Sequence, residues 1–344
     1  MTFRLRVHSG QWRDHLDSVY APEVIPVIKG NGYGLGRDNL AGEARRLGAD
    51  VIAVGTYHEV PEALRTFDGD VMVLSPWRSF CAAGQQALDP RVIHTLGRVR
   101  DIEDLAAAAP AGTRVVIEGL TTMERHGFDR HELAAAAEVI GHLNLLGAAI
   151  HLPLSDSNLT EADTWAGIVQ ASQLPVSTLF VSHLGVDELA ALRAKRPEFS
   201  IRPRVGTRLW LGDITAFDVR ATVLDRHEVS RGERVGYRQR PMPRDGHVLI
   251  VSGGTSHGVG LASPRGAGGL MTRGKALARG GLEAAGLHQS PFVIEGRQRW
   301  FAEPPHMQAS MLFVPGAVEP PEIGDEISAH VRYTTAEFDR IDFD

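Results

Sequence analysis

The chain has 344 residues, of which 43% are hydrophobic, and its formal net charge of −6 gives no sign of a basic surface for nucleic acid or an acidic membrane. Its single cysteine, Cys81, excludes an internal disulfide framework and a cysteine-rich metal site, and we expect no metal. The chain opens without an apolar leader and has no run of about 18 apolar residues. We therefore expect a cytoplasmic globular protein that binds neither nucleic acid nor membrane.

Short β-branched segments alternate with Ala-, Leu-, Glu- and Arg-rich segments over the first two thirds of the chain. This alternation predicts parallel strands joined by crossover helices. Eight strands are expected, at 24–29, 51–56, 71–76, 91–96, 114–119, 148–154, 178–184 and 201–207. Eight such units predict an α/β fold, a TIM (β/α)8 barrel over residues 1–213, and an open doubly wound sheet is the alternative.

The pattern changes after residue 213. Strand-like segments are now separated by Gly/Pro turns, and helical segments mostly stop. Residues 214–344 are therefore expected to form a β-rich C-terminal domain. The glycine-rich segment 256–286 within it predicts a long loop.

A lysine stands at the end of the first predicted strand, in the segment VIPVIKGNGYGLG (24–36). In TIM barrels the carboxyl ends of the strands carry the active site. Partial burial lowers the pKa of a lysine there, which suits Schiff-base formation, a reaction that requires a primary amine. The alternative is a rim lysine whose ammonium group simply reaches water. Lys29 is thus a candidate catalytic residue.

The same segment resembles the pyridoxal-phosphate (PLP) lysine motif of the alanine racemase family, with Lys29, Asn31, Tyr33, Gly34 and Gly36 in register. That family has a PLP-binding barrel followed by a β domain. The resemblance implies a PLP-dependent amino-acid racemase that acts as a homodimer in D-amino-acid metabolism. It also implies that Lys29 is the Schiff-base lysine and that the α-proton is removed from an external aldimine.

Further segments extend the resemblance to other site residues. GLTTMERHGF (119–128) places Arg125 near the substrate carboxylate, where a fixed cation is useful. The resemblance implies these cofactor contacts: Tyr33, Gly206 and Thr207 at the phosphate, His151 beside the pyridine ring, His183 orienting Arg204, and Arg204 at the pyridine nitrogen. An arginine there cannot give up a proton, so the ring is a weaker electron sink, which favours racemisation over transamination. Ordinary core or surface roles are the alternatives for these residues.

The chain departs from the family pattern at its second base. The family has a catalytic tyrosine from the partner subunit, and in VSGGTSHGVG (251–260) that position falls on Thr255, whose hydroxyl is a poor general base. His257 is a candidate substitute. Near the expected substrate-carboxylate site stand His306 and Met307, and Glu118 replaces a lysine that many members carbamylate.

These departures leave two other functions open. One is another fold-type III PLP reaction, such as a D-amino-acid lyase, an aldolase or a decarboxylase. The other is a non-catalytic PLP-binding protein, which the missing tyrosine favours and the large C-terminal domain disfavours.

Overall fold

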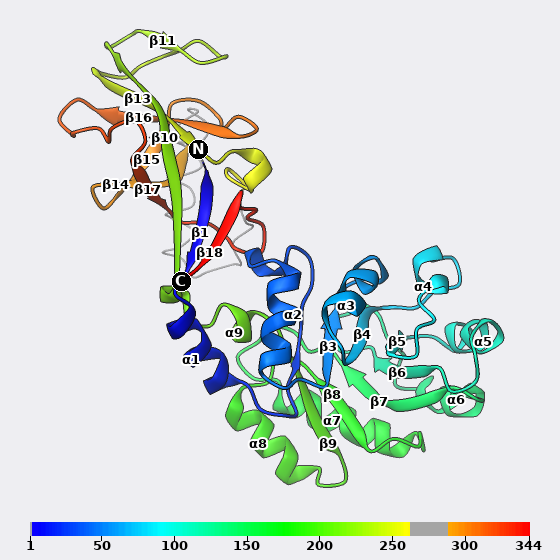
Figure 1. Ribbon diagram of the computed structural model, residues 1–344. Coiled ribbons are helices and arrows are strands. Elements are labelled where there is room, and N and C mark those ends of the chain that lie inside the picture. The colour runs from blue at the N-terminus through cyan, green and yellow to red at the C-terminus, as the bar shows by residue number, and fades with distance from the viewer. Residues whose placement is uncertain (1, 262–287) are drawn as a thin grey trace. The chain divides into compact units, whose positions relative to one another are not determined.

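The computed structural model describes residues 2–261 and 288–344 (Figure 1). Most of the expected loop 256–286 therefore lies outside the described residues. The chain divides into two compact units, which we call the barrel unit (His15–Gly32 and Gly36–Gly212) and the β unit (Met1–Asp14, Tyr33–Leu35 and Asp213–Asp344). Within the described parts of both units, every helix is too short or too polar to cross a bilayer.

The barrel unit contains one parallel eight-stranded sheet in the order β2-β9-β8-β7-β6-β5-β4-β3. A bridge between Val27 and Ala53 joins its two end strands, so the sheet closes as a TIM barrel and not as an open doubly wound sheet. Its strands are β2 (Ile25–Pro26), β3 (Val51–Val54), β4 (Asp70–Pro76), β5 (Val92–Leu96), β6 (Arg114–Gly119), β7 (Asn144–Ile150), β8 (Thr178–Val181) and β9 (Ser200–Val205). Each overlaps one of the eight expected segments.

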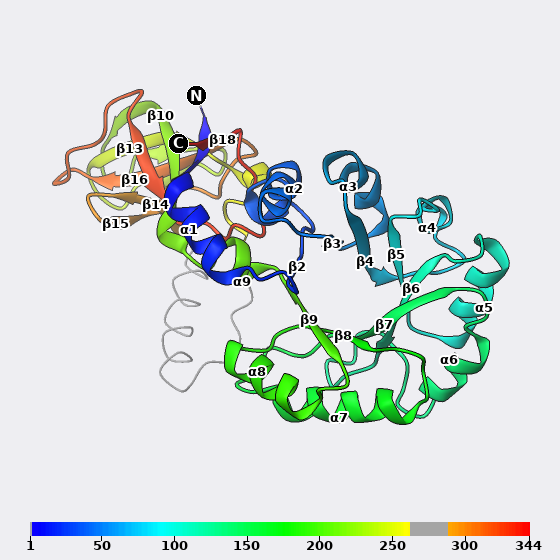
Figure 2. The same cartoon turned by 60° about the horizontal axis from the view of Figure 1, so that its bottom comes forward.

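The helices of this unit follow the strands, and Figure 2 shows α5 to α8 outside the sheet. They are α2 (Arg37–Arg46), α3 (Val60–Thr66), α4 (Ala82–Gln86), α5 (Val99–Ala108), α6 (Leu133–Val139), α7 (Leu159–Ala171), α8 (Val186–Lys195) and α9 (Thr207–Trp210), with α1 (Ser9–Val19) running in from the β unit. Short 3-10 turns add η1 (Gly32–Gly34), η2 (Tyr57–Glu59), η3 (Ile214–Ala216) and η4 (Thr255–His257).

The strands hold together through a shared apolar interior. Seven of them, together with Val27 just after β2, contribute buried residues to a single cluster: Ile25, Val27, Val51, Ala53, Met72, Ile93, Val116, Ala149 and Phe180. Alternate residues of a strand point to one face, so the β-branched segments supply this layer of side chains. A filled interior makes the barrel a rigid base for groups at its strand ends.

The β unit is a mostly antiparallel sheet in the order β13-β16-β15-β14-β17-β10-β1-β18, and β13 also pairs with β10. Its strands are β1 (Phe3–Val7), β10 (Phe217–Val229), β13 (Gly246–Ser252), β14 (Gln289–Ile294), β15 (Arg297–Phe301), β16 (Ala309–Pro315), β17 (Glu326–Ala329) and β18 (Arg340–Phe343), and β11 (Arg234–Val235) and β12 (Arg240–Pro241) form a separate hairpin.

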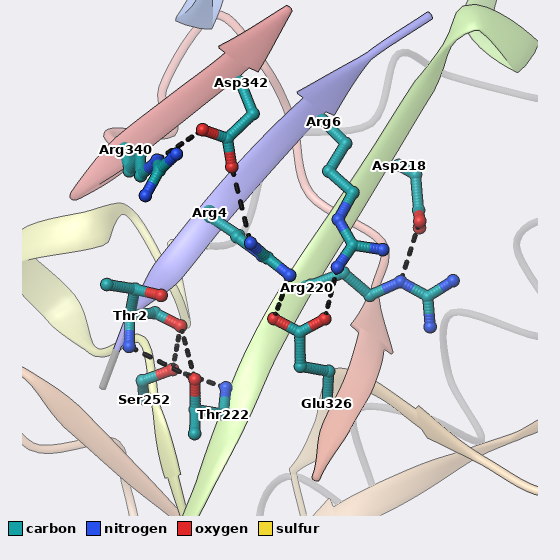
Figure 3. A network of polar contacts seen from close by, with 10 residues as sticks. All are labelled: Thr2, Arg4, Arg6, Asp218, Arg220, Thr222, Ser252, Glu326, Arg340 and Asp342. Atoms are coloured by element: carbon teal, nitrogen blue, oxygen red, sulfur yellow. Dashed lines mark hydrogen bonds and ion pairs between the residues drawn. The ribbon is translucent and has the colours of Figure 1, made fainter. Parts of the chain in front are cut away.

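The first strand differs from our domain expectation, which put residues 1–213 in the barrel. β1 pairs antiparallel with β10 and parallel with β18, so the N-terminal residues lie in the β unit. Figure 3 shows the polar contacts on this part of the sheet: Arg4 and Arg6 both reach Glu326 at 2.6 Å. Partly exposed pairs of this kind each contribute about 1 kcal/mol or less, so they add to the strand pairing but do not replace it.

Candidate active site

Charged and imidazole side chains gather at the carboxyl ends of the barrel strands. Lys29 follows β2, His151 follows β7, and Arg204 ends β9. The pKa of Lys29 is lowered, first by burial and then by the positive charges of Arg125 and Arg204, although Glu59 opposes the shift. The Lys29 side chain is nevertheless open to solvent. It is therefore an accessible amine with a reduced tendency to hold a proton.

The loop after Lys29 is fixed by Glu59. The backbone N–H of Gly30 donates to Oε1 of Glu59 at 2.9 Å, and the N–H of Gly55, at the end of β3, donates to Oε2 at 2.6 Å. Gly55 also approaches the lysine closely, because a Cβ there would lie 3.1 Å from the Cβ of Lys29. Two neighbouring strand ends are thus tied together around the lysine.

Arg204 is the most deeply buried cation of the cluster, with 2% of its side chain exposed. Its Nη2 donates to the carbonyl of Ile150 at 2.9 Å, and its Nη1 lies 3.8 Å from Oε2 of Glu118, whose side chain is 1% exposed. Burial lowers the pKa of Arg204 and raises the pKa of Glu118. Glu118 is thus paired first with Arg204, and Arg125 is its second positive neighbour.

His151 is held as a neutral ring. Burial, and then the charges of Arg204 and Arg125, lower the pKa of His151 to about 2. Its Nδ1 lies 3.1 Å from the hydroxyl of Ser182, in hydrogen-bond contact, and that hydroxyl also accepts the N–H of Leu152, so the ring is held in place. A neutral, fixed imidazole can stack on a planar ring without adding positive charge.

His183 lies beside His151, with ring centroids 5.2 Å apart in an edge-to-face arrangement. Its backbone is left-handed (φ 54°), and its carbonyl accepts a hydrogen bond from Asn158 at 2.9 Å. We expected His183 to orient Arg204. Among the described residues no hydrogen bond joins them, and the hydrogen bond of the guanidinium group goes to the carbonyl of Ile150.

Arg125 lies on the exposed loop after β6, and its Nε donates to Nε2 of His126 at 3.1 Å. Burial and the nearby positive charges lower the pKa of His126 to about 4. Arg125 also lowers the pKa of Lys29, His151 and Arg204, so it belongs to the same cluster.

The expected phosphate contacts are Gly206, Thr207 and Tyr33. Gly206 precedes α9, whose first residue, Thr207, is exposed. Tyr33 is 5% exposed in left-handed backbone (φ 56°) and groups with the β unit by its contacts.

His257 lies in the β unit, in a setting that favours a structural role. It is 8% exposed, its Nδ1 accepts the N–H of Gly254 at 3.2 Å, and its Nε2 lies 3.1 Å from Asp339. Both ring nitrogens are engaged, so His257 would have to leave these partners before it could act as a base. Thr255 begins the same turn and is exposed.

Glu59 and Ser182 contact residues of the site but were not identified from the sequence, although each has a local signal. Thr56 and Glu59 form the T-x-x-E pattern of a capping box after the second predicted strand. Ser182 directly precedes His183 at a strand end. Polar residues at the ends of barrel strands are the general signal for both.

Comparisons with known proteins agree with this architecture. A family profile described as "Alanine racemase, N-terminal domain" matches residues 9–185, about half of the chain. No curated protein sequence matches.

Solved structures are similar at low sequence identity. Alanine racemase from Bartonella henselae with covalently bound pyridoxal phosphate is 18% identical, with a TM-score of 0.71, covering 97% of this chain and 91% of that one. Alanine racemase from Clostridium difficile 630 is 13% identical, with a TM-score of 0.69, covering 95% and 86%. Histidine racemase from Leuconostoc mesenteroides subsp. sake is 15% identical, with a TM-score of 0.63, covering 100% of this chain and 97% of that one.

These structures share the fold. Together with the profile match over residues 9–185, they show that the chain is a divergent member of the alanine racemase family.

Proposed function

We propose that the chain is a PLP-dependent amino-acid racemase, an isomerase that acts in the cytoplasm as a homodimer. The observation that carries the proposal is the amine of Lys29, which is accessible, has a lowered pKa and stands at a barrel strand end beside Arg125 and Arg204. An amine of this kind can both hold a carbonyl cofactor covalently and accept a proton.

The residues of the cluster fit pyridoxal phosphate. Arg204 has a buried Nε without a hydrogen-bond partner in the structure, and both oxygens of Glu118 are in the same condition. The ring of His151 is neutral and fixed, as required of a group that packs on a pyridine ring. The positive charges of Lys29, Arg125 and Arg204 suit an anionic cofactor and a substrate carboxylate.

When bound, the cofactor supplies an electron sink that makes the α-proton of an attached amino acid removable. Lys29 would hold the cofactor and move a proton on one face of the α-carbon. Arg204, as a cation that keeps its protons, would limit the strength of the sink by staying at the pyridine nitrogen. Arg125 would bind the substrate carboxylate, and Gly206, Thr207 and Tyr33 would bind the phosphate.

Exchange of the α-proton with solvent tests this function. The protein is loaded with PLP in D2O, L- and D-alanine are added separately, and the Cα–H signal is followed by NMR, with histidine and other amino acids as a panel. We expect exchange from both enantiomers of at least one amino acid. Lys29→Ala should abolish it, whereas Lys195→Ala, which alters an exposed lysine on α8 paired with Asp163, should leave it unchanged.

Two results would contradict the proposal. Exchange from one enantiomer alone would favour a lyase, aldolase or decarboxylase with a single working base. No exchange from any amino acid, with PLP bound through Lys29, would favour the non-catalytic PLP-binding protein.

A further inference from the structure

The loop after β6 in the barrel unit is closed by backbone hydrogen bonds. The N–H of Phe128 donates to the carbonyl of Glu118, and the N–H of Leu120 donates to the carbonyl of Phe128, both at 2.8 Å. A Cβ at Gly127 would lie 2.6 Å from the backbone nitrogen of Leu120, so only glycine lets the loop return this closely to the end of the strand. His126, the residue before this glycine, therefore stands on a fixed backbone.

His126 accepts a hydrogen bond from its neighbour Arg125. The Nε of the guanidinium group lies 3.1 Å from Nε2 of the imidazole. Every nitrogen of a guanidinium group is a donor, so Nε2 accepts and the proton of the neutral ring is on Nδ1. Burial, and then the charges of Arg125, Arg78 and Arg204, lower the pKa of His126 to about 4. At neutral pH the ring is thus an uncharged acceptor.

This bond decides which part of Arg125 is left for a ligand. A guanidinium group offers a carboxylate two edges, one made by Nε with a terminal nitrogen and one made by the terminal nitrogens Nη1 and Nη2. His126 occupies Nε, so the edge of Nη1 and Nη2 is the one that remains. Among the described residues no carboxylate forms an ion pair with Arg125, and Glu118 pairs with Arg204. The remaining edge therefore suits a carboxylate from outside the chain.

Arg125 belongs to the electrostatic neighbourhood of Lys29. After burial, the charge of Arg125 is what lowers the pKa of Lys29 most, and it also lowers the pKa of His151. All these residues are in the barrel unit and follow the carboxyl ends of its strands. A carboxylate held by Arg125 is thus bound on the same group of strand ends as the amine.

We propose that His126 is a positioning residue for the substrate, which holds Nε of Arg125 and thereby leaves Nη1 and Nη2 for the α-carboxylate of the amino acid. This inference rests on the proposed function, in which Arg125 binds that carboxylate. His126 itself does not touch the substrate and transfers no proton. Its effect is to restrict a long, exposed arginine side chain before the substrate arrives, which reduces the conformational entropy that binding would otherwise cost.

The first test is the dependence of α-proton exchange on amino-acid concentration. His126→Leu should raise KM about three- to tenfold for both enantiomers, the range expected for one hydrogen bond. A contact that holds the ground state and the transition state equally changes KM alone, so kcat should stay within about twofold. His126→Gln should restore KM, because its amide oxygen can accept the same N–H without a charge. A KM that glutamine does not restore would contradict the role of acceptor.

The matched control is His131→Leu. Arg130 and His131 repeat the Arg-His pair five residues further along, and His131 is exposed, with its backbone N–H donating to Asp129 at 2.8 Å. Among the described residues no hydrogen bond joins these two side chains, so this variant should keep the wild-type KM. In an Arg125→Met background His126→Leu should have no further effect, since it acts through the arginine. A further rise in KM there would count against the proposal.

An amine without a carboxylate separates this role from a general effect on the site. If alanine is the amino acid that exchanges, ethylamine is the matching amine, and its binding is followed by the absorbance of the bound PLP. His126→Leu should leave the amine concentration that gives half of the absorbance change within about twofold. An equal loss for the amine and the amino acid would overturn the inference, because the effect would then be independent of the carboxylate.

A further readout needs no cofactor. In the PLP-free protein, NMR follows the Nε–H signal of Arg125, which is assigned by its disappearance in Arg125→Met. A hydrogen-bonded N–H exchanges with water more slowly than a free one. We expect wild type, His126→Gln and His131→Leu to exchange more slowly than His126→Leu at the same pH. Equal exchange in wild type and His126→Leu would overturn the inference, since His126 would then not hold the guanidinium group.

The outcomes separate this inference from the function on which it rests. If the wild type exchanges both enantiomers and His126→Leu has the same KM, the inference fails and the racemase remains. If the wild type exchanges no amino acid, the proposed function fails and this inference falls with it.

Discussion

The pair formed by Arg204 and Glu118 gives a quantitative test of the site. Their side chains are 2% and 1% exposed, and the charged atoms lie 3.8 Å apart. At an effective dielectric constant near 20, charges at this distance attract by about 4 kcal/mol. Removing one partner of a buried pair costs about 3–5 kcal/mol, since the other charge is left without compensation. We therefore expect Arg204→Met or Glu118→Gln alone to lower the barrel unit's melting temperature by about 6–20 °C.

The double variant Arg204→Met/Glu118→Gln provides the decisive comparison, by calorimetry of all four proteins. Its loss should be smaller than the sum of the single losses by about 2–4 kcal/mol, because no isolated charge remains. In Arg204→Met the loss is partly relieved, because burial raises the pKa of the Glu118 carboxyl and a proton can partly replace Arg204. Strict additivity of the two changes would refute the pairing that the geometry indicates.

Three further predictions concern stability. Burial lowers the pKa of His94 to about 4, so its contribution to stability is complete above pH 6.5 and is lost as the pH falls toward 4. The free energy of unfolding should therefore fall by about 3 kcal/mol over this range, and His94→Gln should remove this pH dependence. Phe180→Ala should cost about 3–5 kcal/mol in a thermal melt, because it empties part of the barrel interior, and a loss below 1 kcal/mol would mean that the interior refills. Gly236→Ala should destabilise more than Gly232→Ala, since both have left-handed backbone but only the first would place a Cβ against Glu303; equal melting temperatures would contradict this packing.

Local sequence patterns were sufficient for the barrel. Each β-branched segment shows the residue pattern of a strand and is bounded by glycine or proline, and the residues that fill the barrel interior come from these segments. They were insufficient for β1 and β18. Phe3–Val7 does alternate between buried and partly exposed positions, but its partner in β10 lies more than 200 residues along the chain. Pairing over that separation is decided by the assembled sheet, which a local pattern cannot show.

The site divides in the same way. The lysine, the two arginines and the two barrel histidines could be named from motifs, because each has a recognisable neighbour sequence at a strand end or, for Arg125, on the loop after β6. Their partners could not: Arg204 is held by the carbonyl of Ile150, and a carbonyl has no sequence signature. His257 looked available as a base in the sequence, but folding gives each of its nitrogens a partner.

The electrostatics of the barrel cluster explain why a lysine suits position 29 in a chain whose cations are mostly arginines. The positive charges of Arg125 and Arg204 lower the pKa of Lys29 and of the two barrel histidines. Each positive charge that they fix makes a further proton nearby less favourable. The chemistry proposed for Lys29 needs a neutral amine, and the neighbouring charges help to deprotonate it. An arginine at position 29 would stay charged and could neither bind a carbonyl group nor accept a proton.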